Sequence, residues 1–405
     1  MKILITTDWY EPVINGVVTS VVNLSNELKK RGHEVKILTL SRNHHTYIVG
    51  DVIYAASVGA GKIYPEARLK MPIIKAVIDK LIEWKPDVIH SQCEFSTFFM
   101  AKKIADETNA PIVHTYHTIY EDYTHYFSPN AAWGRKVVQK LTRMLSSRVD
   151  AMIAPSRKIE DVLEKYDVLC PVEVIPSGID MNKFGKYIGT DSRHRIREQY
   201  GLSDDQTVLL YVGRLAKEKN IQEILRCQKR VHGYGTILMI VGDGPYRAEV
   251  EEQVRALGIS ESVIFTGMIE PDKVAEYYQV GDFFVSASTS ETQGLTYVEA
   301  LAAGVPLLCR EDPCLVDVVD PGKNGWKFTD EETFETALVK WLDMSPALRH
   351  QLRRNAVQSA DEFSTRTFVD RVETLYVSVC ELRAMVLQSL IHISEPTRLQ
   401  LISYA

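Results

Sequence analysis

Short runs of β-branched and apolar residues alternate along the chain with longer stretches whose apolar positions recur at helical spacing. This alternation is typical of parallel sheets covered by helices and predicts an α/β fold. In the first half, the expected strands are Lys2–Thr7, Val35–Leu40, Val88–Ser91, Ile112–Thr115, Ala151–Ala154 and Val172–Pro176. In the second half, they are Thr207–Gly213, Thr236–Val241, Val263–Gly267, Phe283–Ala287 and Val305–Cys309.

A polar, turn-rich stretch over residues 177–206 interrupts this alternation. The pattern therefore predicts two doubly wound, Rossmann-like domains that face each other across a cleft. We assign residues 1–180 to the N-terminal domain, 181–206 to a linker and 207–365 to the C-terminal domain, with a helix over 366–385 that crosses back to the N-terminal domain. Residues 386–405 lose periodicity and resemble vector-derived read-through, so we expect a non-native tail there.

Composition narrows the classes of function. The net charge is −6, from 47 basic and 53 acidic residues. Residues 1–185 hold 23 basic and 21 acidic residues, and the rest of the chain holds 24 basic and 32 acidic residues. This distribution argues against general nucleic-acid binding but leaves room for a local anionic partner of the first half. The six scattered cysteines lack metal-ligand spacing and favour a reducing cytoplasm. Neither a signal peptide nor a run of eighteen uncharged apolar residues is found in the sequence.

Two strand-to-helix turns carry groups suited to a phosphate. Gly16 and Val17 stand at the start of a helix after the first strand, where backbone amides and the helix dipole favour an anion. Gly213 ends the strand 207–213. Arg214 and Lys219 follow it and could bind a diphosphate, Arg214 through two parallel hydrogen bonds and Lys219 through its compact positive charge. Each feature also has an ordinary explanation, as a turn glycine or a solvated surface charge.

The most specific pattern is Ser290–Ala300, in which Glu299 lies eight positions after Glu291. If Glu299 lies on a helix that starts near Gly294, then Glu291 lies in the loop before that helix. The two carboxylates would then lie at different depths along one wall of the predicted cleft. The N-terminus of the helix would favour binding of a diphosphate. The sequence Gly242-Asp243-Gly244, in contrast, lacks the third glycine of a dinucleotide fingerprint, because position 247 is arginine.

Together these motifs resemble the retaining nucleotide-sugar glycosyltransferases of family four, which have the GT-B fold, over residues 1–385. Glu291 and Glu299 match the family's Glu-x7-Glu motif. Arg214 and Lys219 match its donor-phosphate pair. The resemblance implies that the N-terminal domain binds the acceptor and that the C-terminal domain binds the nucleotide sugar.

The resemblance also implies roles for single residues. Glu299 is expected to hold the ribose hydroxyls and Glu291 the hydroxyls of the sugar, while Arg214 and Lys219 neutralise the departing diphosphate. His117 matches a histidine that reaches the donor sugar in relatives. The remaining donor-binding residues are expected to be Gly16, Val17, Gly213, Gly294, Leu295 and Thr296.

The chain has no Asp-x-Asp motif. With Arg214 and Lys219 in place to neutralise the leaving group, we expect no metal and no cofactor, and a UDP-sugar as donor substrate. Retention of the α configuration is an implication of the resemblance.

Three features of the first half bear on the acceptor. Lys136, Lys140 and Arg143 fall within an arc of about 60° on an expected helix, separate from an apolar arc of Val137, Leu141, Met144 and Leu145. This pattern suits a helix on an anionic membrane surface, although an ordinary domain helix shows it too. Arg68 and Lys70 lie in a mixed basic and apolar stretch, and Tyr126 in an aromatic-rich loop that could line the acceptor entrance.

Within the family, Asn15–Ser20 and Tyr120–Tyr126 look most like diacylglycerol glucosyltransferases. This likeness implies transfer of a hexose, expected to be glucose, to the 3-hydroxyl of diacylglycerol by a peripheral protein at the inner face of the cell membrane. Two alternatives stay open. One is sugar addition to a polysaccharide or to an already glycosylated lipid, and the other is a nucleotide-sugar-binding protein without turnover.

Overall fold

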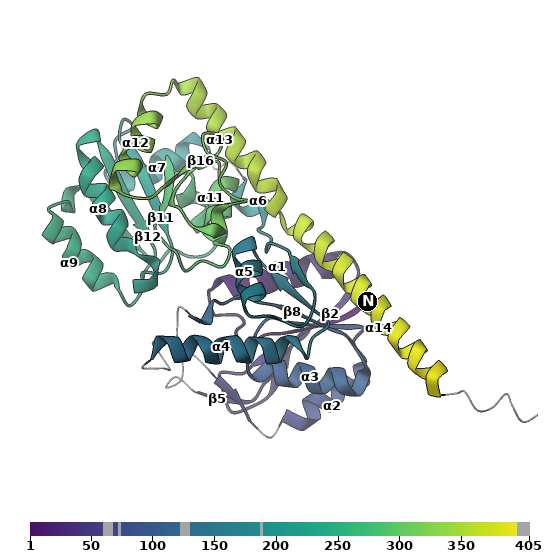
Figure 1. Cartoon of the computed structure of the whole chain (residues 1–405). Coiled ribbons are helices and arrows are strands. Elements are labelled where there is room, and N and C mark those ends of the chain that lie inside the picture. Colours follow the sequence, from purple (N-terminus) through teal and green to yellow (C-terminus); the bar gives the residue numbers. More distant parts are fainter. Residues whose placement is uncertain (60–67, 72–73, 122–129, 187–188, 395–405) are drawn as a thin grey trace, which may run out of the picture. The chain divides into compact units, whose positions relative to one another are not determined.

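The computed structural model describes residues 1–59, 68–71, 74–121, 130–186 and 189–394 (Figure 1). Contacts divide the chain into two compact units. Unit 1 comprises Met1–Pro155, Ile159–Ile175 and the chain from Phe368 onward, and unit 2 comprises Ser156–Lys158 and Pro176–Thr367. Each unit is an α/β domain built on a parallel sheet.

Unit 1 holds a sheet with the strand order β10-β9-β8-β7-β1-β2-β4-β3, parallel except for the β3–β4 pair. Its strands are β1 (Lys2–Thr6), β2 (Glu34–Leu40), β3 (Tyr47–Val49), β4 (Val52–Ala55), β7 (Val88–Ser91), β8 (Ile112–Thr115), β9 (Ala151–Ala154) and β10 (Val172–Val174). A separate hairpin pairs β5 (Ser57–Gly59) with β6 (Arg68–Lys70). Its helices are α1 (Gly16–Lys30), α2 (Lys75–Trp84), α3 (Ser96–Thr108), α4 (Ala131–Ser146) and α5 (Arg157–Lys165).

Both faces of this sheet are buried, which explains why its strands read as nearly continuous apolar runs. Successive side chains of a strand point to opposite faces. In β1, Ile3 and Ile5 therefore join the core that includes residues of α1, while Leu4 joins the core that includes residues of α2 and α3.

Unit 2 holds a parallel sheet with the order β13-β12-β11-β14-β15-β16. Its strands are β11 (Thr207–Val212), β12 (Thr236–Val241), β13 (Val263–Gly267), β14 (Phe283–Ser286), β15 (Leu307–Arg310) and β16 (Gly325–Phe328). Its α-helices are α6 (Met181–Phe184), α7 (Thr190–Gln199), α8 (Ile221–Val231), α9 (Arg247–Leu257), α10 (Val274–Tyr278), α11 (Leu295–Ala302), α12 (Glu331–Leu342) and α13 (Pro346–Ala360).

Residues 181–206, which the sequence analysis assigned to a linker, form α6 and α7 in unit 2. Phe184, Ile196 and Leu202 of this stretch are buried in the core of unit 2. These few apolar positions anchor a stretch whose polar composition otherwise resembles a connection.

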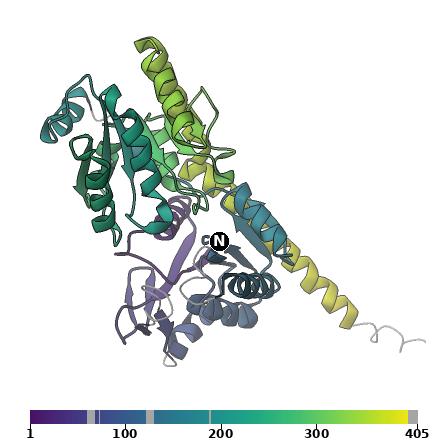
Figure 2. The same ribbon diagram turned by 60° about the vertical axis from the view of Figure 1, so that its left-hand side comes forward.

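The last described helix, α14 (Thr365–Ser394), carries the chain into unit 1 (Figure 1; Figure 2). Phe368, Val372 and Tyr376 are buried in the core of unit 1 together with residues of α1. Residues 386–394 of the expected tail continue this helix, and residues 395–405 lie outside the described chain. Within the described parts, no helix is both long enough and apolar enough to cross a bilayer.

A buried hydrogen bond links α14 to the sheet, and its loss should be measurable. The Tyr376 hydroxyl lies 2.6 Å from Nδ1 of His90, whose Nε2 lies 2.7 Å from Oγ1 of Thr115. Tyr376→Phe would leave Nδ1 of His90 buried without a partner. We expect a loss of about 1–3 kcal/mol in the free energy of unfolding, measured by urea denaturation. Tyr234→Phe, at an exposed site, is the control and should change it by less than about 0.5 kcal/mol.

The order of the strands places a ligand edge in each unit. In unit 1 the chain passes from β1 to β2 on one side and from β7 to β8 on the other, although β1 and β7 are neighbours. In unit 2 the same reversal occurs between β11 and β14. Ligands of doubly wound sheets bind outside the carboxyl ends of the strands at such points.

Candidate active site

In unit 2, the loop after β11 packs closely on the loop after β12. The amide of Leu215 donates to the carbonyl of Asp243 at 3.0 Å. A Cβ on Gly242 would lie 2.1 Å from the carbonyl oxygen of Gly213, and one on Gly244 would lie 2.3 Å from that of Leu215. The Gly-Asp-Gly sequence therefore permits two loops to pack together, which accounts for both glycines without a dinucleotide.

Lys219 closes a short 3₁₀ turn after β11, and its Nζ donates to Oε1 of Glu291 at 2.6 Å. Glu291 follows β14, the neighbour of β11, so the ion pair lies where the strand order reverses. Burial alone would raise the pKa of Glu291, but the charge of Lys219 and hydrogen bonds outweigh it and lower the pKa. At neutral pH this edge of unit 2 therefore carries an ionised carboxylate paired with an ammonium group.

Arg214 belongs to the same loop, but it is more exposed than Lys219. Its side chain is 54% exposed and forms an ion pair with Glu218, four residues along the chain. The backbone carbonyl of Arg214 accepts a hydrogen bond from the hydroxyl of Tyr211 at 3.1 Å. The sequence analysis placed both cations in this loop but did not anticipate the carboxylate that each one contacts.

The Glu-x7-Glu segment has the local structure that its spacing predicts: Glu299 lies on α11 and Glu291 in the loop before it. Gly294, the N-cap of α11, has a φ of +75°, and a Cβ there would lie 2.4 Å from ring carbons of Tyr297. Leu295 and Thr296 form the first turn of α11, where backbone amides have no partner within the helix. The segment thus presents a helix N-terminus beside Glu291.

Glu299 has surroundings different from those of Glu291. Its Oε2 accepts a hydrogen bond from the hydroxyl of Tyr278 at 2.6 Å. Burial raises the pKa of Glu299, because this hydrogen bond and the charge of Lys183 compensate only in part. The structure therefore holds Glu299 through a neutral donor and Glu291 through a cation.

Two residues that the sequence analysis did not select hold the Glu291 loop. Lys158 Nζ donates to the carbonyl of Thr289 at 2.6 Å, and the hydroxyl of Ser156 donates to the carbonyl of Thr292. Both lie more than 130 positions from the loop in sequence, so no local pattern could identify them. They fix the backbone on both sides of Glu291.

The remaining candidate residues of this set belong to unit 1. Gly16 and Val17 open α1, whose N-cap Asn15 accepts a hydrogen bond from the amide of Val18 at 2.9 Å. His117 follows β8, and its Nε2 lies 2.7 Å from Oε1 of Gln92. Burial, with a smaller effect of His114, lowers the pKa of His117 to about 3. His117 is therefore neutral and donates from Nε2 to Gln92.

These observations can be set beside known proteins. The family model described as Glycosyltransferase Family 4 matches residues 14–183, and the one described as Glycosyl transferases group 1 matches residues 192–359. The alpha-monoglucosyldiacylglycerol synthase of Streptococcus pneumoniae is 35% identical over 386 residues, which cover 93% of this chain and 86% of that protein. The protein of that name from Acholeplasma laidlawii is 32% identical over 395 residues, which cover 94% of this chain and 98% of that protein. The chain is a family-four glycosyltransferase.

Solved structures agree with the fold of this glycosyltransferase. HepE of Anabaena, solved in complex with UDP and glucose, superposes with a TM-score of 0.74 over 93% of this chain and the whole of that one, at 18% identity. The two units are thus the two α/β domains of the GT-B fold, as the sequence analysis predicted.

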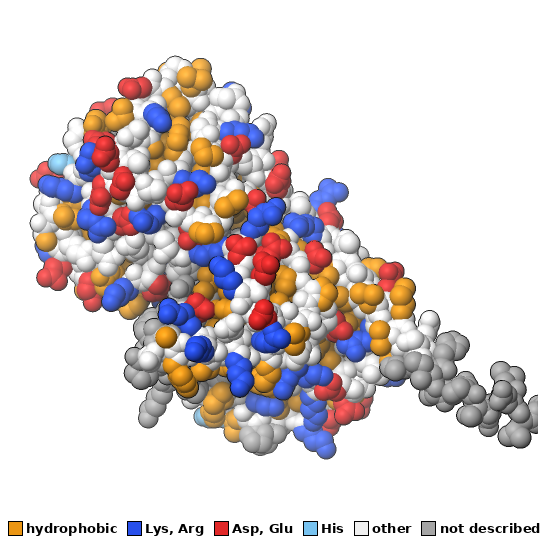
Figure 3. Space-filling model, viewed as in Figure 1, with side chains coloured by type: hydrophobic (Ala, Val, Ile, Leu, Met, Phe, Trp, Pro, Cys, Tyr) orange, Lys and Arg blue, Asp and Glu red, His pale blue; other side chains and the backbone are white. Residues whose placement is uncertain are grey.

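Helix α4 of the glycosyltransferase exposes apolar as well as basic side chains. Lys136, Lys140 and Arg143 are exposed, and Figure 3 shows basic and hydrophobic side chains next to one another over the position that α4 has in Figure 1. Arg143 pairs with Asp167 at 3.6 Å, whereas Lys136 and Lys140 form no ion pair within the described chain.

The apolar arc predicted for α4 is only partly correct. Leu145 is buried, as expected of the core-facing side, but Leu141 and Met144 are 54% and 42% exposed. The buried side is instead formed by Val138, Thr142 and Leu145. Helical geometry accounts for Met144, which lies nearer to the basic arc than to this side, whereas Leu141 lies just outside the margin of the buried side. Trp133, also exposed, extends the outward apolar surface.

The other residues assigned to the acceptor side differ in their surroundings. Arg68 on β6 donates from Nε to the hydroxyl of Ser57 at 2.6 Å and from Nη2 to the carbonyl of Arg42 at 2.9 Å, so its guanidinium holds the β5–β6 hairpin. Lys70 on the same strand is exposed. Tyr126 lies outside the described residues.

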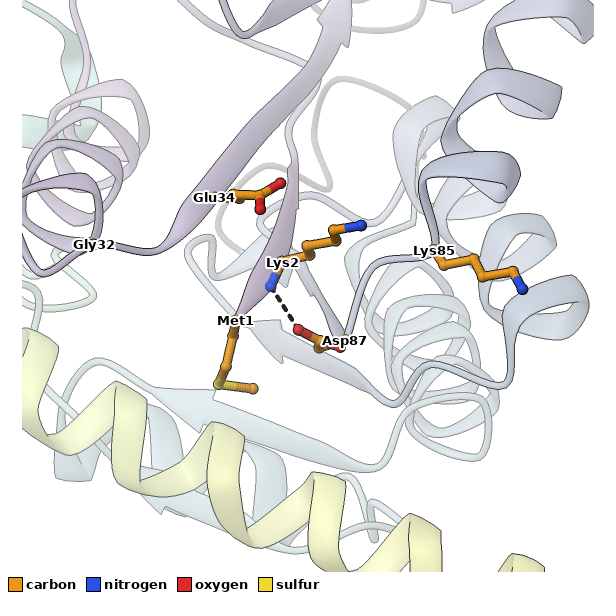
Figure 4. A pocket seen from close by; sticks show the side chains of 6 residues that line it. All are labelled: Met1, Lys2, Gly32, Glu34, Lys85 and Asp87. Atoms are coloured by element: carbon orange, nitrogen blue, oxygen red, sulfur yellow. Dashed lines mark hydrogen bonds between the residues drawn. The ribbon is translucent and has the colours of Figure 1, made fainter.

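A surface depression in unit 1 lies apart from the ligand edge. It is lined by Met1, Lys2, Gly32, Glu34, Lys85 and Asp87 (Figure 4). The amide of Lys2 donates to Asp87 there at 2.6 Å. Because these residues lie at the amino ends of β1, β2 and β7, the depression is at the end of the sheet opposite to Gly16, Gln92 and His117.

Proposed function

We propose that this glycosyltransferase moves glucose from UDP-glucose to the 3-hydroxyl of diacylglycerol, with retention of the α configuration and without a metal. Two observations support the donor and the acceptor. The two relatives described above, at 35% and 32% identity, carry the name alpha-monoglucosyldiacylglycerol synthase, and HepE, which has a similar fold, was solved with UDP and glucose.

The main structural support for this proposal is the Lys219–Glu291 ion pair at the carboxyl ends of β11 and β14. Cleavage of the anomeric bond leaves negative charge on the diphosphate and positive charge on the sugar ring. A cation already held at the site lowers this barrier, because it needs no reorganisation as the charge appears. Lys219 supplies that charge, and Arg214 on the same loop adds a guanidinium that can form two parallel hydrogen bonds to a phosphate.

In the structure both cations contact carboxylates, Lys219 that of Glu291 and Arg214 that of Glu218. We propose that the donor diphosphate replaces these contacts. Glu291 is then released to accept hydrogen bonds from the sugar hydroxyls. Glu299, which remains held by the hydroxyl of Tyr278, accepts hydrogen bonds from the ribose. In unit 1, the neutral ring of His117 and the free amides of Gly16 and Val17 serve the sugar and the phosphate.

We further propose that α4 binds an anionic membrane surface and keeps the protein at the inner face of the cell membrane. Its exposed Trp133, Leu141 and Met144 can enter the interface between headgroups and acyl chains, while Lys136 and Lys140 attract the anionic headgroups. Packing within unit 1 does not account for these exposed apolar side chains.

A panel of donors and acceptors tests the proposal. UDP-glucose, UDP-galactose, GDP-mannose and ADP-glucose would each be offered with diacylglycerol in anionic vesicles, with monoglucosyl diacylglycerol in the same vesicles and with a soluble oligosaccharide. We expect the highest kcat/KM for UDP-glucose with diacylglycerol. Transfer to the oligosaccharide or to the glycosylated lipid alone would contradict the proposed acceptor, and UDP-glucose binding without release of UDP would contradict an enzyme.

A further inference from the structure

The point of strand reversal in unit 1 holds acidic groups that the donor site does not use. Asp8, after β1, is buried and held by the start of α3. Its carboxylate accepts hydrogen bonds from the amide and the hydroxyl of Thr97 at 2.9 and 2.6 Å and from the amide of Ser96 at 3.2 Å. Asp8 thus stabilises the fold of unit 1. The other acidic residue at this edge, Glu94, is the candidate for binding a ligand.

Glu94 follows β7 and its carboxylate is held by the side chains of His114 and Tyr120. Its Oε1 lies 3.3 Å from Nε2 of His114, and its Oε2 accepts a hydrogen bond from the hydroxyl of Tyr120. Nδ1 of His114 is buried and has no partner within the described chain. Since a carboxylate oxygen only accepts, the contact with Nε2 is a hydrogen bond in which Nε2 donates. Within the described residues, no lysine or arginine forms an ion pair with Glu94.

The carboxylate of Glu94 still has capacity for a ligand. An ionised carboxylate offers about four acceptor positions, of which two are used here. The side chain is 13% exposed, so one part of it is open to solvent. A carboxylate that is largely removed from water and has no lysine or arginine partner among the described residues gains from a further hydrogen bond, and a hydroxyl group supplies one.

The surface beside Glu94 is apolar. Phe95 and Phe99 are 47% and 48% exposed, and the ring of Phe95 packs edge-on against that of Tyr120 at a centroid distance of 5.7 Å. A hydrogen-bond acceptor flanked by exposed aromatic rings fits an alcohol that has a large apolar part. It fits a sugar diphosphate poorly, because the carboxylate would repel it.

We propose that Glu94 accepts a hydrogen bond from the hydroxyl of the acceptor alcohol that receives the sugar, and that Phe95 and Phe99 contact the apolar part of this alcohol. His114 and Tyr120 are then positioning residues, which hold the carboxylate of Glu94 in place. This inference rests on the proposed function, because it assigns a residue to the acceptor of that reaction.

The test compares Glu94→Gln with Glu107→Gln, a neutralisation of an exposed glutamate on the neighbouring helix α3. For Glu94→Gln we expect kcat/KM for diacylglycerol in vesicles to fall roughly 10- to 100-fold, as for loss of a hydrogen bond to a charged group. Affinity for UDP, measured by titration calorimetry, should stay unchanged. Glu107→Gln should leave both quantities unchanged.

Two further variants examine the parts of the proposal separately. Tyr120→Phe removes one donor to Glu94 and should raise KM for the acceptor without changing the affinity for UDP. Phe99→Ser should raise KM for a long-chain diacylglycerol more than for a short-chain, water-dispersed one. An equal effect on both lipids would overturn the role of the aromatic surface.

The outcome for Glu94 is separable from that for the proposed function. If the wild type transfers sugar only to a saccharide, the proposed acceptor is wrong, and the Glu94→Gln comparison is made with that saccharide. An unchanged kcat/KM for whichever acceptor the wild type uses would overturn the role of Glu94. A loss of affinity for UDP equal to the loss of transfer would overturn it too, because Glu94 would then act through the donor site or the fold.

Discussion

Lys219→Ala is expected to lower kcat for sugar transfer by roughly 10²- to 10³-fold, the range found when one preorganised donor to a developing anion is removed. The apparent affinity for UDP-glucose should change far less, because the charge of Lys219 matters most as the diphosphate departs. Steady-state kinetics with varied UDP-glucose separates kcat from KM. Lys219→Arg, which retains the positive charge, should recover part of the lost rate.

The control is Lys217→Ala, because Lys217 lies in the same 3₁₀ turn but is exposed. It should leave kcat within about two-fold of the wild type, as expected for an exposed charge away from the reacting atoms. If kcat survives in Lys219→Ala, or if Lys217→Ala lowers it equally, Lys219 does not stabilise the leaving group.

Replacement of Lys136, Lys140 and Arg143 by serine is expected to release the protein from anionic vesicles. Each basic residue near such a surface contributes about 1 kcal/mol, so the loss of three should lower the partition coefficient roughly 100-fold. The salt dependence of binding should become flatter, since fewer charges are screened. Sedimentation with vesicles of defined anionic content, at several salt concentrations, measures both effects.

A control with the same number of basic residues exists on α8 in unit 2, where Arg226, Lys229 and Arg230 are exposed. Their replacement by serine removes the same net charge and should leave vesicle binding close to that of the wild type. Equal release by both triple variants would show that net charge, and not α4, governs attachment. Persistent binding of the α4 variant would show that α4 only packs against unit 1.

The fold was largely predictable because the long strands are buried on both faces and therefore read as apolar runs. The expected strand Lys2–Thr7, for example, corresponds to β1 (Lys2–Thr6). The strands that were missed are β3, β4, β5, β6 and β16, which are exposed or only partly buried, whereas the equally short β7, β8 and β9 are buried throughout and were predicted. In retrospect, β3 and β4 flank the turn residues Gly50 and Asp51, which are typical of a tight hairpin.

The candidate site was predictable where its residues are close in sequence. Glu299 lies eight positions after Glu291, and a helix starts at Leu295 between them. This spacing alone therefore predicted that Glu299 lies on the helix and Glu291 in the loop before it. Lys158 on α5 holds the Glu291 loop, and His114 on β8 holds Glu94 after β7. These contacts join separate elements of the fold, so no local pattern in the sequence reports them. The side of α4 that faces the core was misjudged for a similar reason, since burial depends on the neighbouring elements.

The most direct measurement is the identity and linkage of the lipid formed from UDP-glucose and diacylglycerol vesicles, determined by mass spectrometry and proton NMR of the chloroform-soluble product. The account predicts diacylglycerol carrying a single hexose, joined through an α linkage to the 3-hydroxyl. A product with a β linkage, or the absence of any glycolipid while UDP-glucose is consumed, would contradict it.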